Sequence, residues 1–254
     1  MIMPSRSETG SSRPPRAPLE VCLASTADER RQAQRLRYEV FVLEMGARLP
    51  SAELGLDCDR LDAHCDHLLV REPATRRIVG TYRLLPPERV DAAGGWYCGE
   101  EFDLAPLQPW RRQIVEIGRA CVDPGYRNGL VVALLWAGVM RYVRAHCAAY
   151  LIGCASLGTE DGGHVAASLC RRLLRDNLTG PAWRVTPRRA FALEGWRDEP
   201  QAPMPALLKG YLRLGAEVCG EPAWDSAFRT ADLLVRLDVG RANPRYVERL
   251  PRAA

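Results

Sequence analysis

The chain has almost no lysine and no long apolar run. Of its 35 lysine and arginine residues, Lys209 is the only lysine. No apolar stretch approaches the roughly 18 residues of a membrane-spanning helix, and the first residues lack the apolar centre of a secretory signal. We therefore expect a cytoplasmic protein. Residues 1–20 are rich in Ser, Pro and Arg and are predicted to form a disordered tail, followed by a single domain over residues 21–254.

Metal-binding and nucleic-acid-binding patterns are also missing. The nine cysteines include no CxxC pair, and their odd number argues against a disulfide framework. The one dense cluster, Cys58, His64, Cys65 and His67, matches no common zinc spacing, so we predict no metal. The net charge is +4, but no basic stripe is interleaved with aromatic residues, so we predict no nucleic-acid partner.

The periodicity of the remaining chain is that of a mixed α/β domain. Apolar positions at near-helical spacing predict a helical segment over 26–46, in which 27–37 is rich in helix formers, and helices over 129–146, 164–175 and 205–214. Strands are predicted over 67–72 and 77–85 as a hairpin, and over 114–122, 150–154, 216–219 and 232–238. Strand–helix–strand order indicates a crossover connection, but periodicity alone fits several α/β folds.

Five segments in a fixed order carry a family resemblance. They are Arg37-Tyr-Glu-Val-Phe41, Asp59-Arg-Leu-Asp62 with Cys65-Asp-His67, Gly80-Thr-Tyr-Arg83, Glu116-Ile-Gly-Arg119 with Val122-Asp-Pro-Gly-Tyr-Arg127, and Ile152-Gly-Cys-Ala-Ser156. This pattern resembles the carrier-protein-dependent branch of the GNAT superfamily, which includes acyl-homoserine-lactone synthases. Further segments at 208–215, 220–224 and 243–246 are similar to bacterial ornithine N-acyltransferases that make lyso-ornithine lipid.

The resemblance implies a fold and an activity. The fold would be a central, mostly antiparallel twisted sheet flanked by helices. The activity would be transfer of a long, 3-hydroxylated acyl chain from acyl carrier protein to the α-amine of an amino acid, with ornithine expected. No tightly bound cofactor is expected, because the phosphopantetheine arm of the carrier brings the donor. Contact with the membrane surface would follow from the lipid product. An acyl-homoserine-lactone-type synthase and a non-catalytic lipid- or carrier-binding protein are the alternatives.

Attack of an amine on a thioester needs a group that removes a proton from the ammonium. Glu116, in the middle of a predicted strand, is our candidate base, and Arg119 is placed with it in the catalytic set. The alternative is that Glu116 pairs with Arg119 or Arg83 in a structural ion network. We predict that the acceptor amino acid is bound by Arg37, Arg83, Asp59 and Asp62. The two aspartates would bind a second ammonium group of the acceptor, as in ornithine. The alternative is that Asp59 and Asp62 are solvated acids in a turn. Phe41 is predicted to be core or to line the acyl tunnel.

The segment after Glu116 departs from the GNAT proteins that bind coenzyme A. Those proteins have the motif Arg/Gln-x-x-Gly-x-Gly/Ala at this place, because small residues let backbone amides close on a pyrophosphate. This chain has Leu130 and Val132 at the small positions, so we expect Arg127, Asn128 and Gly129 to meet the single phosphate of a carrier's arm. An acidic carrier protein needs a basic docking face, for which the candidates are Arg141, Arg144, Arg171, Arg172 and Arg175.

Overall fold

The computed structural model describes residues 18–251. Of the tail predicted over 1–20, all but the last three residues therefore lie outside the described part, and Glu20 begins strand β1 (Glu20–Leu23). Among residues 18–251, no helix combines the length and the apolar composition needed to cross a membrane.

One sheet organises the domain. Its strands lie in the order β1, β2 (Asp66–Arg71), β3 (Ile78–Leu85), β5 (Ile114–Val122), β6 (Tyr150–Gly158), β10 (Thr230–Asp238) and β8 (Glu217–Val218), and β9 (Ala223–Asp225) also pairs with β10. All pairs in this sheet are antiparallel except β5 with β6. Strands β4 (Phe102–Asp103) and β7 (Thr186–Pro187) form a separate small pair. The predicted mixed sheet with mostly antiparallel strands is confirmed.

The first four helices begin and end close to the predicted limits, and the short fifth one was not predicted. They are α1 (Ala27–Arg37), α2 (Leu130–Ala145), α3 (His164–Asp176), α4 (Ala206–Leu214) and α5 (Pro244–Val247). Thr26 caps α1, because its side-chain oxygen accepts the backbone N–H of Glu29 at 3.1 Å. The chain then continues directly as a π-helix over Tyr38–Glu44. The π-helix, a form often found at functional sites, was not predicted.

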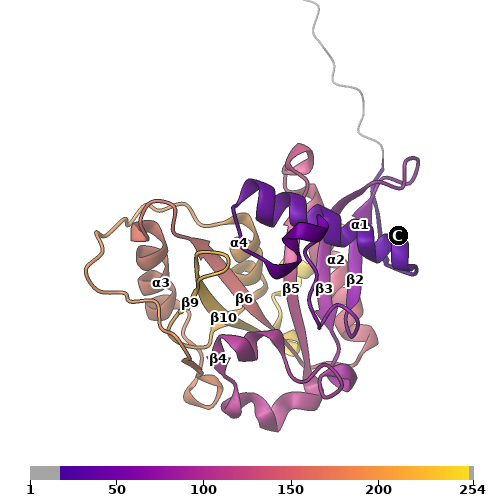
Figure 1. Cartoon of the computed structure of the whole chain (residues 1–254). Coiled ribbons are helices and arrows are strands. Elements are labelled where there is room, and N and C mark those ends of the chain that lie inside the picture. Colours follow the sequence, from indigo (N-terminus) through magenta and orange to yellow (C-terminus); the bar gives the residue numbers. More distant parts are fainter. Residues whose placement is uncertain (1–17, 252–254) are drawn as a thin grey trace, which may run out of the picture.

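Helices cover both faces of the sheet (Figure 1). Alternate residues of β10 show the two layers, since Leu233 packs in the cluster that contains α2, α3 and α4, and Leu234 packs in the opposite one. The opposite face carries α1 and the short helical turns of residues 86–113. We call the first layer the α2 face and the second the α1 face.

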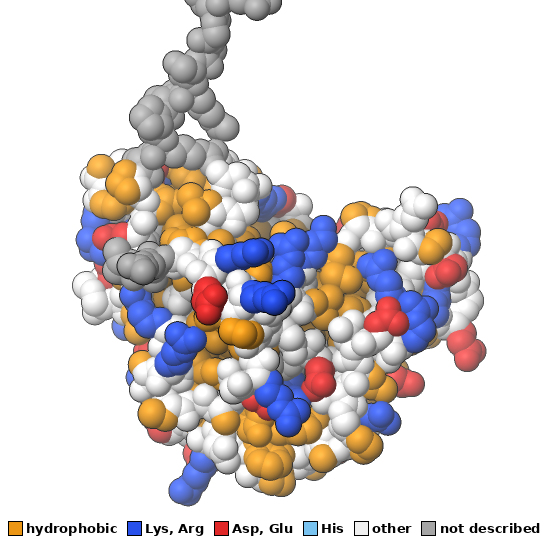
Figure 2. Space-filling view, turned by 180° about the vertical axis from the view of Figure 1, so that it is seen from behind, with side chains coloured by type: hydrophobic (Ala, Val, Ile, Leu, Met, Phe, Trp, Pro, Cys, Tyr) orange, Lys and Arg blue, Asp and Glu red, His pale blue; other side chains and the backbone are white. Residues whose placement is uncertain are grey.

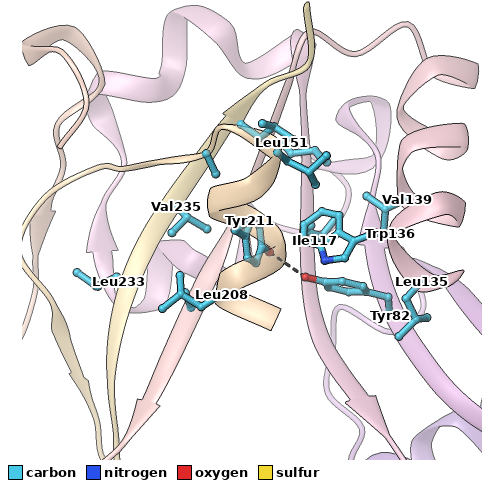
Figure 3. Packing of buried hydrophobic residues seen from close by; sticks show 14 of the residues in the cluster. Tyr82, Ile117, Leu135, Trp136, Val139, Leu151, Leu208, Tyr211, Leu233 and Val235 are labelled. Carbon is cyan, nitrogen blue, oxygen red and sulfur yellow. Dashed lines mark hydrogen bonds between the residues drawn. The ribbon is translucent and has the colours of Figure 1, made fainter. Parts of the chain in front are cut away.

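The core of the α2 face is aromatic (Figure 3). Tyr82 of β3 and Tyr211 of α4 share a hydrogen bond of 2.8 Å between their hydroxyl groups, and both rings meet Trp136 of α2 edge-on. Gly210 lets α4 approach, because a Cβ there would lie 2.4 Å from the indole nitrogen of Trp136. This packing fixes α2 and α4 on either side of the line where β5 and β6 meet.

Candidate active site

Strands β5 and β6 separate at the centre of the sheet. They pair in parallel only from Ile114 with Tyr150 to Glu116 with Ile152. Beyond that point β5 follows β3, and β6 follows β10 along its whole length. In the described part of the chain, the edges of β5 and β6 that face each other beyond Glu116 have no strand partner. The separation leaves a wedge-shaped opening through the sheet.

A cavity of about 480 Å³ occupies this opening. Val132, Leu135 and Leu207 line it from the α2 face, and Phe41 and Leu61 line it from the α1 face. The cavity therefore runs from one layer of the domain to the other. Figure 2, which looks at the α2 side, shows a hollow with a largely hydrophobic floor and with arginine or lysine side chains beside it.

A β-bulge brings extra residues of β5 into the cavity. Thr81 pairs with Cys121 and Arg83 pairs with Gly118, so Tyr82 alone stands opposite two residues of β5. One of these two is Arg119, whose φ of 52° lies in the left-handed region. The bulge breaks the alternation of side chains, and Gly118, Arg119 and Ala120 all line the cavity.

Glu116 lies where the strands part, and it is buried at the cavity wall. Each of its carboxylate oxygens accepts one backbone N–H, from Tyr97 and from Cys98, both at 2.8 Å. Burial raises the pKa of Glu116 and outweighs these hydrogen bonds, which lower it. Among the described residues Glu116 has no ion-pair partner, so the alternative in which it pairs with Arg83 or Arg119 is not what the structure shows.

The predicted acceptor residues form an ion network beside the cavity. Arg37 is fully buried, and its guanidinium lies 3.1 Å from Asp57 and 2.9 Å from Asp62. Arg83 donates to both carboxylate oxygens of Asp59 at 2.7 Å. Arg119 lies 3.3 Å from Asp57 and 3.7 Å from Asp59. Asp57 is a member of this network that the sequence analysis missed.

The aspartates of the network are paired with its own arginines. Burial opposes ionisation of Asp62, but Arg37 and Arg83 outweigh it and hold its pKa below the usual value. Asp59 and Asp62 are not among the residues that line the cavity, and neither is Arg37, whereas Arg83 and Arg119 do line it. Of the four residues predicted for the acceptor, the structure thus brings Arg83 to the cavity, beside Arg119 of the predicted catalytic set, and places Arg37, Asp59 and Asp62 behind them.

Aromatic rings hold Arg119 in place. Its guanidinium carbon lies 4.6 Å from the ring centre of Tyr97 and 4.7 Å from that of Phe228. Phe41, in the π-helix, meets Phe228 edge-on with ring centres 5.6 Å apart, and both rings line the cavity. Phe41 is therefore a wall residue as well as a core residue. Tyr97 begins a short 3-10 helix (Tyr97–Glu100) and Phe228 lies in a turn, and neither segment has a periodic pattern, so the sequence carried no signal for them.

The start of α2 lies at the mouth of the cavity. Arg127 and Gly129 line it, and Gly129 adopts a left-handed φ of 88° just before the helix. Arg127 forms a bidentate pair with Glu44 of the π-helix, at 2.5 and 2.7 Å. Asn128 accepts the backbone N–H of Leu130 at 3.1 Å instead of pointing to a ligand, and Leu130 is exposed.

The five arginines predicted for docking lie outside the cavity on two helices. Arg141 and Arg144 are on the last turns of α2, and Arg171, Arg172 and Arg175 are on α3. Arg171 also holds the loop after α3, because it donates to the carbonyl of Leu193 at 2.7 Å and lies 3.2 Å from Asp198. Arg175 pairs with Asp176 at 2.7 Å.

Comparison with known proteins gives one consistent family. Residues 36–137 match the acetyltransferase (GNAT) domain. The chain is 38% identical over 248 residues to the L-ornithine N(alpha)-acyltransferase of Brucella abortus, covering 90% of this chain and 87% of that one. It is 39% identical over 254 residues to the protein of the same name from Agrobacterium fabrum, covering 90% and 84%.

Solved structures share the fold at low sequence identity. The N-acyl amino acid synthase FeeM from uncultured soil microbes superposes with a TM-score of 0.54 at 13% identity, covering 88% of this chain and 92% of that one. The AHL synthase LasI gives 0.52 at 12% identity, covering 88% and 91%. The GNAT-like fold is thereby confirmed.

Proposed function

Since the chain belongs to the L-ornithine N(alpha)-acyltransferase family and is an N-acyltransferase, we propose that it acylates the α-amine of ornithine. The acyl group is a long 3-hydroxylated chain, the donor is acyl carrier protein, and the product is lyso-ornithine lipid. The observation that carries the reaction type is Glu116, a buried carboxylate without a cation partner at the point where β5 and β6 part.

The reaction needs a proton acceptor beside the acceptor amine. Glu116, with its pKa raised by burial, takes one proton from the α-ammonium, directly or through one water. The free amine nitrogen forms a bond to the thioester carbon, and the carbon–sulfur bond breaks. The second proton of the attacking nitrogen passes to the pantetheine sulfur, directly or through water, and the sulfur leaves as a thiol. Backbone N–H groups of β5 beyond the end of its pairing with β6 are the proposed donors for the oxyanion.

The two faces of the cavity divide the substrates. The donor arm enters past the start of α2, and its acyl chain lies along the apolar walls from the α2 face and the π-helix. The acceptor lies on the α1 face, where Glu116, Arg83 and Arg119 meet. Arg83 and Arg119 bind the acceptor's carboxylate. Both pair with aspartates, but both also line the cavity, where a guanidinium can donate to a carboxylate.

A carrier protein suits the mouth of this cavity better than coenzyme A does. Arg127 is paired to Glu44, and the first turn of α2 carries Leu130 and Val132 where a pyrophosphate needs small residues. A donor with one phosphate makes fewer demands on this turn. Arginines on α2 and α3 then offer a docking face for an acidic carrier.

The test is a reaction with defined substrates. The purified chain is incubated with 3-hydroxyacyl carrier protein and a panel of amino acids, and the N-acyl products are identified by mass spectrometry. We expect N-acylornithine as the main product and much slower reaction with the matched acyl-coenzyme A. Equal rates with both donors would refute the carrier assignment, and a product formed from S-adenosylmethionine would favour the lactone-synthase alternative.

A further inference from the structure

The cavity touches a second acidic cluster, away from the arginine–aspartate network. Asp225 at the end of β9 and Asp232 in β10 line the cavity, and Asp232 lies close to Glu101. One ligand atom each of Glu101, Asp232 and Cys154 lies within 4.8 Å of the others. We call Glu101, Asp225 and Asp232 the acidic pocket. It lies on the α1 face, because Asp232 shares its side of β10 with Leu234.

The acidic pocket has no counter-charge of its own. Over residues 18–251, none of its three carboxylates forms an ion pair with an arginine, a lysine or a histidine. Asp232 is 3% exposed, and its Oδ2 accepts the hydroxyl of Ser156 at 3.0 Å. Its Oδ1 and the Oε1 of Glu101 are buried without a hydrogen-bond donor. A buried carboxylate that lacks a donor is costly, so this arrangement favours a cationic ligand.

The ion network near the cavity differs from the acidic pocket in its balance of charge. The three aspartates of the ion network share three arginines. In the acidic pocket, burial and neighbouring carboxylates raise the pKa values of Glu101 and Asp232, so either a proton or a cation between them lowers their mutual repulsion. An entering cation would replace that proton.

Two cysteines separate the acidic pocket from Glu116. The backbone N–H of Cys98 donates to Glu116, and the Sγ of Cys98 lies 3.4 Å from the Sγ of Cys154. The Sγ of Cys154 lies 3.7 Å from the Oε2 of Glu101. Glu116, the proposed base, and the acidic pocket are thus separated along the cavity wall by the side chains of Cys98 and Cys154. A diamino acid has the same pattern of two ammonium groups joined by a short apolar chain.

We propose that Asp232, together with Asp225 and Glu101, binds the side-chain ammonium of a basic acceptor amino acid and selects it over neutral acceptors. The proposal rests on the proposed N-acylation of ornithine and assigns the residues that read its second charge. It moves that role from Asp59 and Asp62, which are paired within the network. An ammonium suits the pocket because it brings three N–H donors to Asp232 and Glu101, each of which has one buried carboxylate oxygen without a donor.

A metal ion suits the pocket less well. The group offers two carboxylates and one thiol within ligand distance of each other, which is fewer ligands than a closed zinc or calcium site uses. The thiol is a poor ligand here, because its hydrogen bond with Cys98 and its burial raise the pKa of Cys154.

The experiment compares ornithine with norvaline, which has the same carbon chain without the side-chain amine. We expect Asp232→Asn to lower kcat/KM for ornithine by about ten- to a hundred-fold, mainly through KM, as loss of a charge-assisted hydrogen bond to a buried carboxylate does. The slower reaction with norvaline should change by less than about two-fold. Asp225→Asn gives a second variant in case the first folds poorly, and thermal unfolding of each variant checks the fold.

The matched control is Asp238→Asn, at the far end of the same strand and outside the cavity, which should leave both acceptors unchanged. Equal losses for ornithine and norvaline in Asp232→Asn and Asp225→Asn would overturn the proposal while the ornithine N-acylation stands. A wild-type chain that acylates norvaline as well as any basic acceptor would overturn both. Activity removed by a chelator and restored by a divalent metal would assign the pocket to a metal instead.

Discussion

Replacing Glu116 with glutamine removes the charge of the proposed base with little change in size. The carboxylate accepts two backbone N–H groups at 2.8 Å, one on each oxygen. Glutamine has one acceptor oxygen, and its amide NH₂ would face the other N–H. The variant therefore loses one charge-assisted hydrogen bond, which destabilises the fold by about 1.5–3 kcal/mol. The same change also removes a buried charge. Burial is the main cause of the raised pKa of Glu116, so removing the charge stabilises the fold.

The lost hydrogen bond and the removed buried charge change the stability in opposite directions, so the net change in stability is small. The reaction rate has no such compensation. We expect the midpoint of thermal unfolding of Glu116→Gln to stay within about 5 °C of wild type. The rate constant for N-acylation at neutral pH should fall by about a hundred- to ten-thousand-fold, the usual contribution of a general base. Single-turnover kinetics with acyl carrier protein and ornithine would measure this loss.

The pH profile separates a base from a structural carboxylate. A base acts when ionised, so wild-type activity should rise as pH passes upward through the raised pKa of Glu116. In the variant this rise should disappear, and activity should recover at high pH as free amine accumulates. Glu100→Gln, an exposed neighbour that pairs with Arg60, is the control. A Glu116→Gln variant within a few-fold of wild type, or one that keeps the wild-type pH profile, would refute the reasoning.

Three further changes have defined outcomes. Arg37→Met removes the guanidinium that lies nearest to two buried aspartates and leaves Asp57 and Asp62 with only the longer contacts to Arg119 and Arg83, so urea unfolding should show a loss of about 3–5 kcal/mol; a loss below about 1 kcal/mol would contradict the structural role of the network. Reversing the charges of Arg171, Arg172 and Arg175 should raise KM for the carrier protein and weaken its salt dependence, and unchanged kinetics at low salt would place docking elsewhere. Hydrogen bonds from Ser25 lower the pKa of Glu29 to about 2, so this carboxylate stabilises the fold above its ordinary pKa of 4.5 and less as pH falls from there toward 2. Glu29→Gln should flatten that acid limb in equilibrium unfolding, and an unchanged limb would contradict the assignment.

Local sequence was sufficient for most elements of the fold. Strand β5 was predicted with the limits that the structure has, and α2 to within a residue at each end, because apolar spacing and the flanking turn and glycine act on neighbouring residues. The short strands β1 and β9 were missed, since a run of three or four residues has too few positions to show a period. The family resemblance supplied the mostly antiparallel character of the sheet, and the order of its strands came only from the structure, because periodicity does not encode it.

The sequence also located Glu116, Arg119 and Phe41 in the cavity wall, since each lies in a motif or a periodic segment. It could not tell which charges pair with which. Asp59 and Asp62 were predicted to bind the acceptor and Asp57 was not singled out, whereas the fold brings Arg37, Arg83 and Arg119 against all three. Pairing depends on distances between segments far apart in the chain, which no local pattern contains.

The acidic pocket was decided by tertiary structure alone. Asp232 looked like the first residue of an apolar strand, and Glu101 and Asp225 like ordinary loop acids. Only the separation of β5 from β6, with β9 and β10 closing one side, places the buried Asp232 beside the half-buried Glu101 and Asp225, and within residues 18–251 all three lack a cation. Burial and the absence of a partner are properties of the assembled layers, because a charge is costly only when the surrounding chain has excluded water from it.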